Sequence, residues 1–290
     1  MIARIRSNGI RHLLTYIMGL LLFGSNGIVA SRIEMSSYGI VFYRTLLGSL
    51  LLIEVFLFSG GRFRFASMNR THLYLVVGSG IAMGTSWIFL YEAYQRIGVG
   101  LASLLYYTGP VFVVLMSPVL FCEKLTPVKL LCFAAVLLGM LLTNLHQLQA
   151  GEDIAGLLYV LGSAVMYAFM VILNKKAESI TGMKNATIQL SVSFLTVAVF
   201  VCFRGGIAMP TDGSQWLWLI LLGLINTGMG CYLYFSSIGH LRVQTVSVLG
   251  YIEPLSALLL SVALLHEPFS LMQCIGAVLI LGGAIMMSRE

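Results

Sequence analysis

Long apolar stretches, separated by short polar or charged segments, follow one another along the whole 290-residue chain. A helix needs about 20 apolar residues to cross the hydrocarbon core of a bilayer. On that criterion the pattern predicts ten transmembrane helices, with approximate bounds 13–31, 38–58, 72–95, 100–121, 127–145, 154–174, 186–204, 215–237, 243–264 and 270–287. Little chain is left between them, so any binding must take place within or between the helices. The pattern predicts an all-α integral membrane protein.

The second half of the chain repeats the first at an offset of about 144 residues. The segments that begin at Val99 and Val243 align without a gap, and the matched positions are Val99/Val243, Ser103/Ser247, Tyr107/Tyr251, Pro110/Pro254, Leu115/Leu259, Ser117/Ser261, Leu120/Leu264, Glu123/Glu267 and Gly139/Gly283. We expect residues 1–150 and 151–290 to form two five-helix repeats. Because five is an odd number, the second repeat would enter the bilayer inverted relative to the first. Inverted repeats are typical of alternating-access transporters.

The composition supports an integral membrane protein, and the sequence argues against a soluble globular protein, a metal site and an ATP-hydrolysing enzyme. The chain is 59% hydrophobic and 10% charged with a mean hydropathy of +0.94, far from soluble globular usage. The five cysteines lack metal-ligand spacing and stand in or beside apolar spans, so they are interpreted as packing residues. A phosphate-binding GxxxxGK[ST] loop is absent from the sequence, which argues against ATP hydrolysis. We expect neither a metal nor a cofactor.

Cationic residues are distributed unequally between alternate loops. One side carries Arg4, Arg6, Arg11, Arg62, Arg64, Arg70, Lys124, Lys129, Lys175, Lys176, Lys184, Arg242 and Arg289, and the other only Arg32, Arg96 and Arg204. Since cationic loops stay in the cytoplasm, we expect both termini there and the protein in the cell membrane. The same residues explain the net charge of +6, so nucleic acid is not an expected partner. The first span resembles a signal peptide, but its cleavage would leave nine helices and destroy the repeat.

Several short motifs carry a family resemblance. They are the Leu22–Asn26 segment LFGSN in the first span, Arg44 in the second, and the two repeat endings, Glu123–Pro127 before Gly139 and Glu267–Ser270 before Gly283. In this pattern the chain resembles the drug/metabolite transporter superfamily, in its ten-helix branch of two EamA-type repeats. The resemblance implies a basket of helices around a central cavity. Relatives of this kind include exporters of amino acids and related metabolites.

Glu253 is the strongest candidate for a functional residue. Charged groups at membrane depth are costly and usually face protein or water. Glu253 lies near the middle of the ninth span, directly before Pro254, which is expected to kink the helix and free the carbonyl of Gly250. The matching residue in the first half is Gly109, so the repeat is asymmetric here, as the binding of one asymmetric substrate would require.

Arg44 lies seven residues into the second span. At this depth its side chain is too far from the end of the helix to serve only as an interfacial anchor. Its guanidinium group is suited to binding a carboxylate or phosphate in bidentate fashion. Arg44 and Glu253 would then hold opposite ends of a zwitterion. The alternative is a buried ion pair between these two residues that only joins helices.

Other polar and aromatic residues are weaker candidates. Asn26 and Asn226 are amides within spans that either bind ligand or bridge helices. Trp87 and Tyr91 are candidate substrate contacts. Their neighbour Glu92, like Glu54, is interpreted as an interfacial anchor. The remaining groups are His12 and His240 at span ends, and Glu123 and Glu267, which are interpreted as structural acids near helix N-termini, with a gating role as the alternative.

Tyr107 and Tyr251 belong to matched stripes with helical spacing, which also contain Pro110 and Pro254, and both prolines are expected to kink their helices or take part in gating. These stripes either line the cavity or allow close helix packing. On a straight helix Glu253 and Tyr251 point in opposite directions. The sequence leaves open which face of the ninth helix meets the cavity.

The sequence therefore predicts a secondary transporter, an exporter of a small organic metabolite such as an amino acid. Proton coupling through Glu253 is a further expectation, because a carboxyl group buried in apolar surroundings takes up a proton more readily. A facilitative carrier or importer and a non-transporting receptor or scaffold are the alternatives. An enzyme is not expected, because the sequence places no nucleophile with a base, or second acid, at one depth. The expected partners are a small molecule and lipid, with the protein as a monomer or homodimer.

Overall fold

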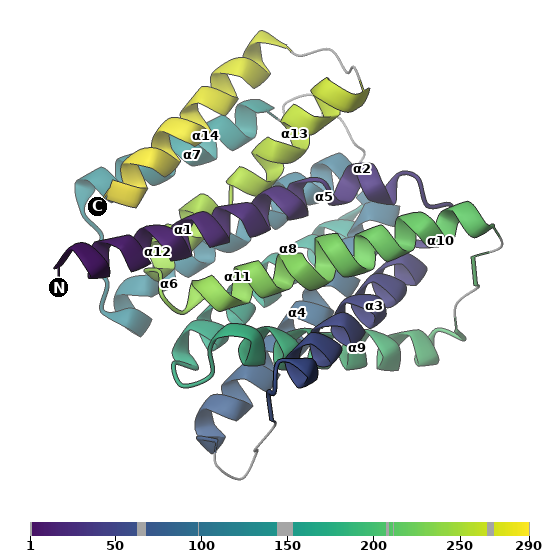
Figure 1. The fold of residues 1–290 in the computed structure, drawn as a ribbon. Coiled ribbons are helices and arrows are strands. Elements are labelled where there is room, and N and C mark those ends of the chain that lie inside the picture. The colour runs from purple at the N-terminus through teal and green to yellow at the C-terminus, as the bar shows by residue number, and fades with distance from the viewer. Residues whose placement is uncertain are drawn as a thin grey trace.

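The computed structural model describes residues 2–62, 68–97, 99–143, 153–206, 209–210, 212–265 and 270–289. Regular structure in this part of the chain is entirely helical, and helices cover each of the ten predicted stretches. Six of those stretches are single helices: α3 (Ser37–Phe58), α4 (Arg70–Ile97), α7 (Pro127–Thr143), α8 (Ile154–Lys176), α9 (Gly182–Phe203) and α14 (Leu271–Arg289). Both termini lie at the same end of the bundle (Figure 1).

The other four stretches are interrupted. They consist of α1 (Ile2–Gly24) with α2 (Asn26–Ala30), α5 (Val99–Tyr106) with α6 (Gly109–Phe121), α10 (Gly213–Ile220) with the π-helical η3 (Leu221–Met229) and α11 (Gly230–Ile238), and α12 (Val243–Leu249) with α13 (Ile252–Leu265). Hydroxyl groups help to satisfy the backbone at two breaks: Ser25 donates to the Leu22 carbonyl at 2.8 Å and Thr108 to that of Leu105 at 2.7 Å. Such partners matter because a lipid core offers no water.

Six stretches of the described residues are long and apolar enough to cross a membrane, judged by length and composition. They are 10–30, 37–58, 70–97, 154–176, 182–203 and 213–238. Shorter apolar helices lie at 109–121, 127–142 and 274–283. The protein is thus a multi-pass membrane protein, and ten crossings remain a prediction.

The two prolines of the repeat open new helices instead of kinking continuous ones. Pro110 is the second residue of α6 and Pro254 the third of α13, where a missing N–H group costs little. The expected free carbonyl at Gly250 is wrong, because this oxygen accepts the Glu253 N–H at 3.2 Å. The chain makes a tight turn there, and α13 starts again with Pro254 in its first turn.

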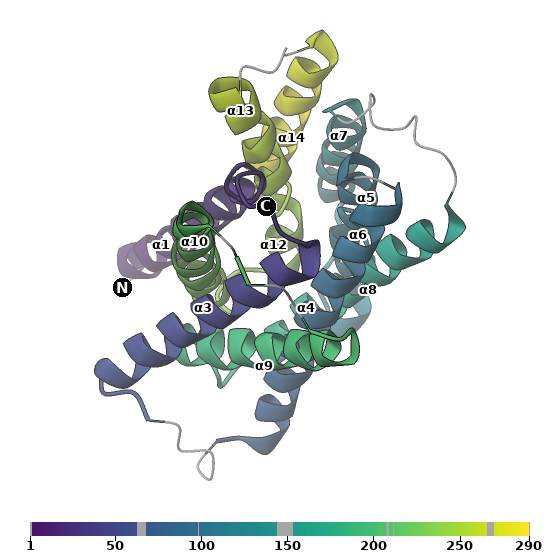
Figure 2. The same cartoon turned by 90° about the vertical axis from the view of Figure 1, so that its right-hand side faces the viewer.

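Helices from the two halves pack against one another throughout the bundle. α7 packs on α14, α3 on α9, and α4 on α8 and α9 (Figure 2), and α1 packs on α11 (Figure 1). The α7–α14 contact is reciprocal: a Cβ atom at Gly139 would lie 2.6 Å from the Gly276 carbonyl oxygen, and one at Gly283 2.7 Å from that of Cys132. The two contacts are equivalent in the repeat, because Gly283 lies 144 positions after Gly139 and Gly276 lies 144 positions after Cys132. Both glycines are therefore required by close approach of the two backbones.

Candidate functional site

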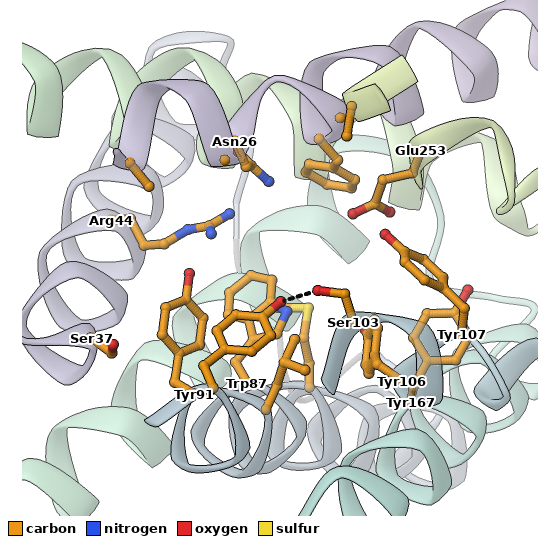
Figure 3. A pocket seen from close by; sticks show the side chains of 18 of the residues that line it. Asn26, Ser37, Arg44, Trp87, Tyr91, Ser103, Tyr106, Tyr107, Tyr167 and Glu253 are labelled. Carbon is orange, nitrogen blue, oxygen red and sulfur yellow. Dashed lines mark hydrogen bonds between the residues drawn. The ribbon is translucent and has the colours of Figure 1, made fainter. Parts of the chain in front are cut away.

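A cavity of about 630 Å³ lies inside the bundle, and both halves of the chain contribute to its walls. Its lining comes from α1 to α5, α8, α11 and α13. Six of the predicted site residues line it, namely Asn26, Arg44, Trp87, Tyr91, Tyr107 and Glu253 (Figure 3). The sequence therefore identified both charged groups of the cavity.

Arg44 projects from α3 and is only 5% exposed. Its Nε donates a 3.0 Å hydrogen bond to the Thr227 hydroxyl, and its guanidinium carbon lies 4.9 Å from the centre of the Trp87 ring. Within the described residues, no carboxylate comes within ion-pair distance of Arg44. A buried cation without a counter-charge is costly. The site is therefore suited to an anionic group supplied by a ligand.

Glu253 is the second residue of α13 and enters the cavity from the side opposite Arg44 (Figure 3). The Tyr107 hydroxyl points toward its carboxylate (Figure 3). The alternative of a buried ion pair with Arg44 is wrong for this conformation, because the structure shows no salt bridge between these two described residues. The cavity thus presents a cation and an anion with open space between them.

The structure also explains why only one half carries an acid at this position. A Cβ atom at Gly109 would lie 2.7 Å from the Tyr167 ring and 3.0 Å from the Ala164 carbonyl oxygen. A glutamate there would displace α8. The asymmetry of the repeat is therefore imposed by packing as well as by the chemistry of the cavity.

The two asparagine candidates have different environments. Asn26 begins α2 and lines the cavity. Asn226, in η3, is not among the lining residues, and it donates to the Leu22 carbonyl at 2.9 Å and to the Ser25 hydroxyl at 2.7 Å. Asn226 is a bridging residue that holds the break between α1 and α2.

The structure answers the question of which face of the ninth span meets the cavity. Tyr251 stands outside the lining, fully buried, and donates to the Tyr107 carbonyl at 2.7 Å. Glu253 faces the cavity because the chain turns between α12 and α13. The expectation that Tyr251 contacts substrate is therefore not supported by its position.

Several aromatic lining residues were not predicted. Tyr94, Tyr106 and Tyr167 join Trp87 and Tyr91 in the wall, and the Ser103 hydroxyl donates to that of Tyr94 at 3.1 Å. These tyrosines lie in apolar stretches and have no spacing that separates a cavity-facing ring from a lipid-facing one. The sequence carries no signal that would have identified them.

Near the termini, hydrogen bonds join α6 of the first half to α12 of the second (Figure 1). Glu123, after α6, accepts hydrogen bonds from the backbone N–H groups of Val243 and Gln244, at 2.9 and 3.2 Å. The Gln244 side chain donates to the Ser117 hydroxyl at 2.7 Å. The structural interpretation of Glu123 is confirmed, but the helix that it caps, α12, belongs to the other half. Glu267 lies outside the described residues.

The remaining polar candidates lie away from the cavity. Glu92 forms an ion pair with Arg204 at the end of α9, and Glu54 is exposed on α3. The rings of His12 and His240 meet edge to face with centroids 3.9 Å apart. Burial lowers the pKa of His240, in the loop after α11, and the charges of His12 and Lys175 act in the same direction. None of these four groups contributes to the cavity.

A multi-pass helical bundle with a charged internal cavity defines a protein of the membrane-transporter class. The EamA-like transporter family matches the chain twice, over residues 11–145 and 154–289. The chain therefore belongs to this family, within the drug/metabolite transporter superfamily.

Curated relatives support this class. An uncharacterized transporter of Archaeoglobus fulgidus is 27% identical, with 94% of this chain and 95% of the relative covered. The uncharacterized transporter YxxF of Bacillus subtilis is 24% identical over 92% of this chain and 86% of its own length. The threonine/homoserine exporter RhtA of Escherichia coli is 26% identical, with 87% of this chain and 83% of the relative covered. One crystal structure matches 97% of this chain and 99% of its own with a TM-score of 0.80, and its 22% identity shows the fold alone.

Proposed function

We propose that this transporter exports a small organic metabolite, such as an amino acid, by alternating access between its two halves. The observation that carries the proposal is the cavity, in which Arg44 and Glu253 face each other across open space. A zwitterion would place its carboxylate at Arg44 and its ammonium group at Glu253. Export of an amino acid is favoured by the name of the relative RhtA, a threonine/homoserine exporter.

Alternating access requires two halves that can exchange conformations. The reciprocal packing of Gly139 and Gly283 supports a two-fold relation between the repeats. If each half crosses the membrane five times, this relation inverts one half relative to the other. With this arrangement the distribution of cationic residues predicts that both termini lie in the cytoplasm, on the side where Glu123 joins the two halves.

Coupling to protons is part of the proposal. Glu253 is the acid that lines the cavity, so substrate and proton would compete for the same carboxylate. Binding of the substrate ammonium group requires the ionised carboxylate, and release is favoured when Glu253 takes up a proton. This competition would link efflux of the metabolite to entry of a proton.

The first experiment compares cells that produce equal amounts of wild type, Glu253→Gln, Arg44→Gln and the exposed-site control Glu54→Gln. Extracellular metabolites are measured by mass spectrometry. We expect one metabolite to accumulate outside cells with wild type and Glu54→Gln, and not with the two cavity variants. Depletion of a metabolite from the medium would instead indicate an importer. Equal accumulation of one metabolite outside all four cultures would keep the exporter but reduce Arg44 and Glu253 to structural roles, and no accumulation in any culture would favour an importer, a receptor or a scaffold.

A further inference from the structure

The π-helical segment η3 meets α3 at the depth of Arg44. Gly48 lies one turn after Arg44 on the same face of α3. A Cβ atom at Gly48 would lie 3.0 Å from the Gly223 carbonyl oxygen and 3.1 Å from the Gly228 nitrogen. The two backbones therefore approach closely, and this brings the Arg44 side chain to Thr227.

The Thr227 hydroxyl has a fixed orientation. It donates its one hydrogen to the Leu222 carbonyl at 2.8 Å, five residues earlier, which is the spacing of a π-helical turn. The oxygen can then serve Arg44 only as an acceptor, and it accepts the Nε–H at 3.0 Å. An ordinary α-helical turn would place a different residue over Arg44.

Two sides of the guanidinium group are thus held by the protein. Thr227 fixes Nε, and the Trp87 ring covers one face. In the part of the chain that the structure describes, the terminal nitrogens of Arg44 have no ion-pair partner. Figure 3 shows the group directed into the cavity. Two parallel N–H groups held in this way match the geometry of a carboxylate.

We propose that Thr227 is the positioning residue of a carboxylate-binding subsite at Arg44, built by the π-helical turn of η3. This inference rests on the proposed function and names the group that the substrate presents at this end. Without the hydroxyl acceptor, Nε would need another partner and the guanidinium group would turn away from the cavity. Thr227 would thus act on the substrate only through Arg44.

The test reads the subsite with a simple anion and needs no identified substrate. The chain has three tryptophans. Replacing Trp216 and Trp218 by phenylalanine leaves Trp87, beside Arg44, as the single tryptophan, whose emission is excited selectively over that of the tyrosines. Quenching by iodide then reports an anion next to Arg44, while quenching by neutral acrylamide reports access to the cavity. In this background we expect the ratio of iodide to acrylamide quenching to fall severalfold in Thr227→Val, as in Arg44→Gln.

Two further variants distinguish the loss of the Thr227 hydroxyl as an acceptor for Arg44 from a general disturbance of the fold. Thr227→Ser keeps the hydroxyl and is expected to retain the wild-type ratio. Thr196→Val, on α9, removes a hydroxyl that makes the same kind of bond, to the Val192 carbonyl at 2.9 Å, and should leave the ratio unchanged. If Thr227→Val does not fold, Thr227→Ala removes the same acceptor with a smaller side chain.

A wild-type ratio in Thr227→Val or Thr227→Ala, with a reduced ratio in Arg44→Gln, would overturn the positioning role. A wild-type ratio in Arg44→Gln would overturn the anion subsite itself. Because fluorescence quenching does not depend on transport, a failed efflux experiment would reject the proposed function and leave this result standing. The two proposals can therefore fail separately.

Discussion

The Tyr251 hydroxyl donates a 2.7 Å hydrogen bond to the backbone carbonyl of Tyr107, the residue 144 positions earlier in the chain. The two tyrosines occupy equivalent places in the repeat but have different roles. Tyr251 is buried behind the cavity, whereas Tyr107 lines it and points its hydroxyl toward Glu253 (Figure 3). One of the pair joins the halves and the other faces the ligand space.

Phenylalanine at either position should therefore give opposite phenotypes. Tyr251→Phe leaves the Tyr107 carbonyl without this donor, and we expect a loss of about 1 kcal/mol in unfolding free energy. Tyr107→Phe should change transport and leave stability near wild type. Thermal unfolding in detergent and an efflux assay on both variants check this. Equal destabilisation by both substitutions would contradict the assignment.

Glu253→Gln is expected to remove the response of efflux to a pH gradient. Glutamine has the shape of glutamate but cannot exchange a proton. Since a hydrogen bond to a charged group contributes about 1.5–3 kcal/mol, affinity for a cationic group should also fall by about tenfold or more. Efflux is measured from vesicles with and without an acidic exterior. A gradient response as large as that of wild type would exclude Glu253 as the coupling residue.

Glu123→Gln should weaken the contact between the two halves at the start of α12. The substitution removes the negative charge that stabilises the N-terminus of α12, an effect of about 1 kcal/mol. We expect a Ser117→Cys reporter, buried in this region, to react faster with a maleimide when Glu123→Gln is present. Exposed native cysteines are replaced first in both proteins. Unchanged labelling would show that this contact does not hold the halves together.

Adjacent glycines of α14 provide a matched test of the interface between the halves. A Cβ atom at Gly283 would lie 2.6 Å from Val136 Cγ2, whereas one at Gly282 would meet nothing within 4 Å. We expect Gly283→Ala to lower the unfolding free energy by about 1–3 kcal/mol. Gly282→Ala should be neutral, or stabilising by up to about 1 kcal/mol. Unfolding temperatures measured side by side in detergent distinguish these signs.

Much of the architecture follows from the length and position of the apolar stretches. The predicted span 72–95 is the helix Arg70–Ile97. The predicted span 127–145 begins, as α7, at Pro127, where the Thr126 hydroxyl accepts the Lys129 N–H at 3.2 Å. The breaks at Ser25 and in η3 were not predicted. Their hydrogen-bond partners, such as Asn226 for Ser25, come from helices distant in sequence. Local propensity carries no information on such partners.

The charged residues of the site were predictable because the cost of burying charge makes Arg44 and Glu253 conspicuous in apolar spans. The sequence predicts a structural role for Glu123 but not the helix that it caps. The acid was interpreted correctly as structural, but its partner Val243 lies 120 residues away. Tyr94 and Tyr167 could not be predicted as cavity residues, because an apolar span tolerates tyrosine on any face.

The π-helical turn of η3 also changes the phase between the two ends of its span. An α-helix advances about 100° per residue, so a turn that accommodates about one extra residue rotates α11 by a comparable angle relative to an unbroken continuation of α10. Cys231, Tyr234 and Phe235 reach the cavity from α11 beyond this shift. Deleting a single residue between Leu221 and Met229 would restore a regular helix and leave that stripe facing the ligand space, whereas winding η3 as an α-helix with all of its residues would turn the same side chains away.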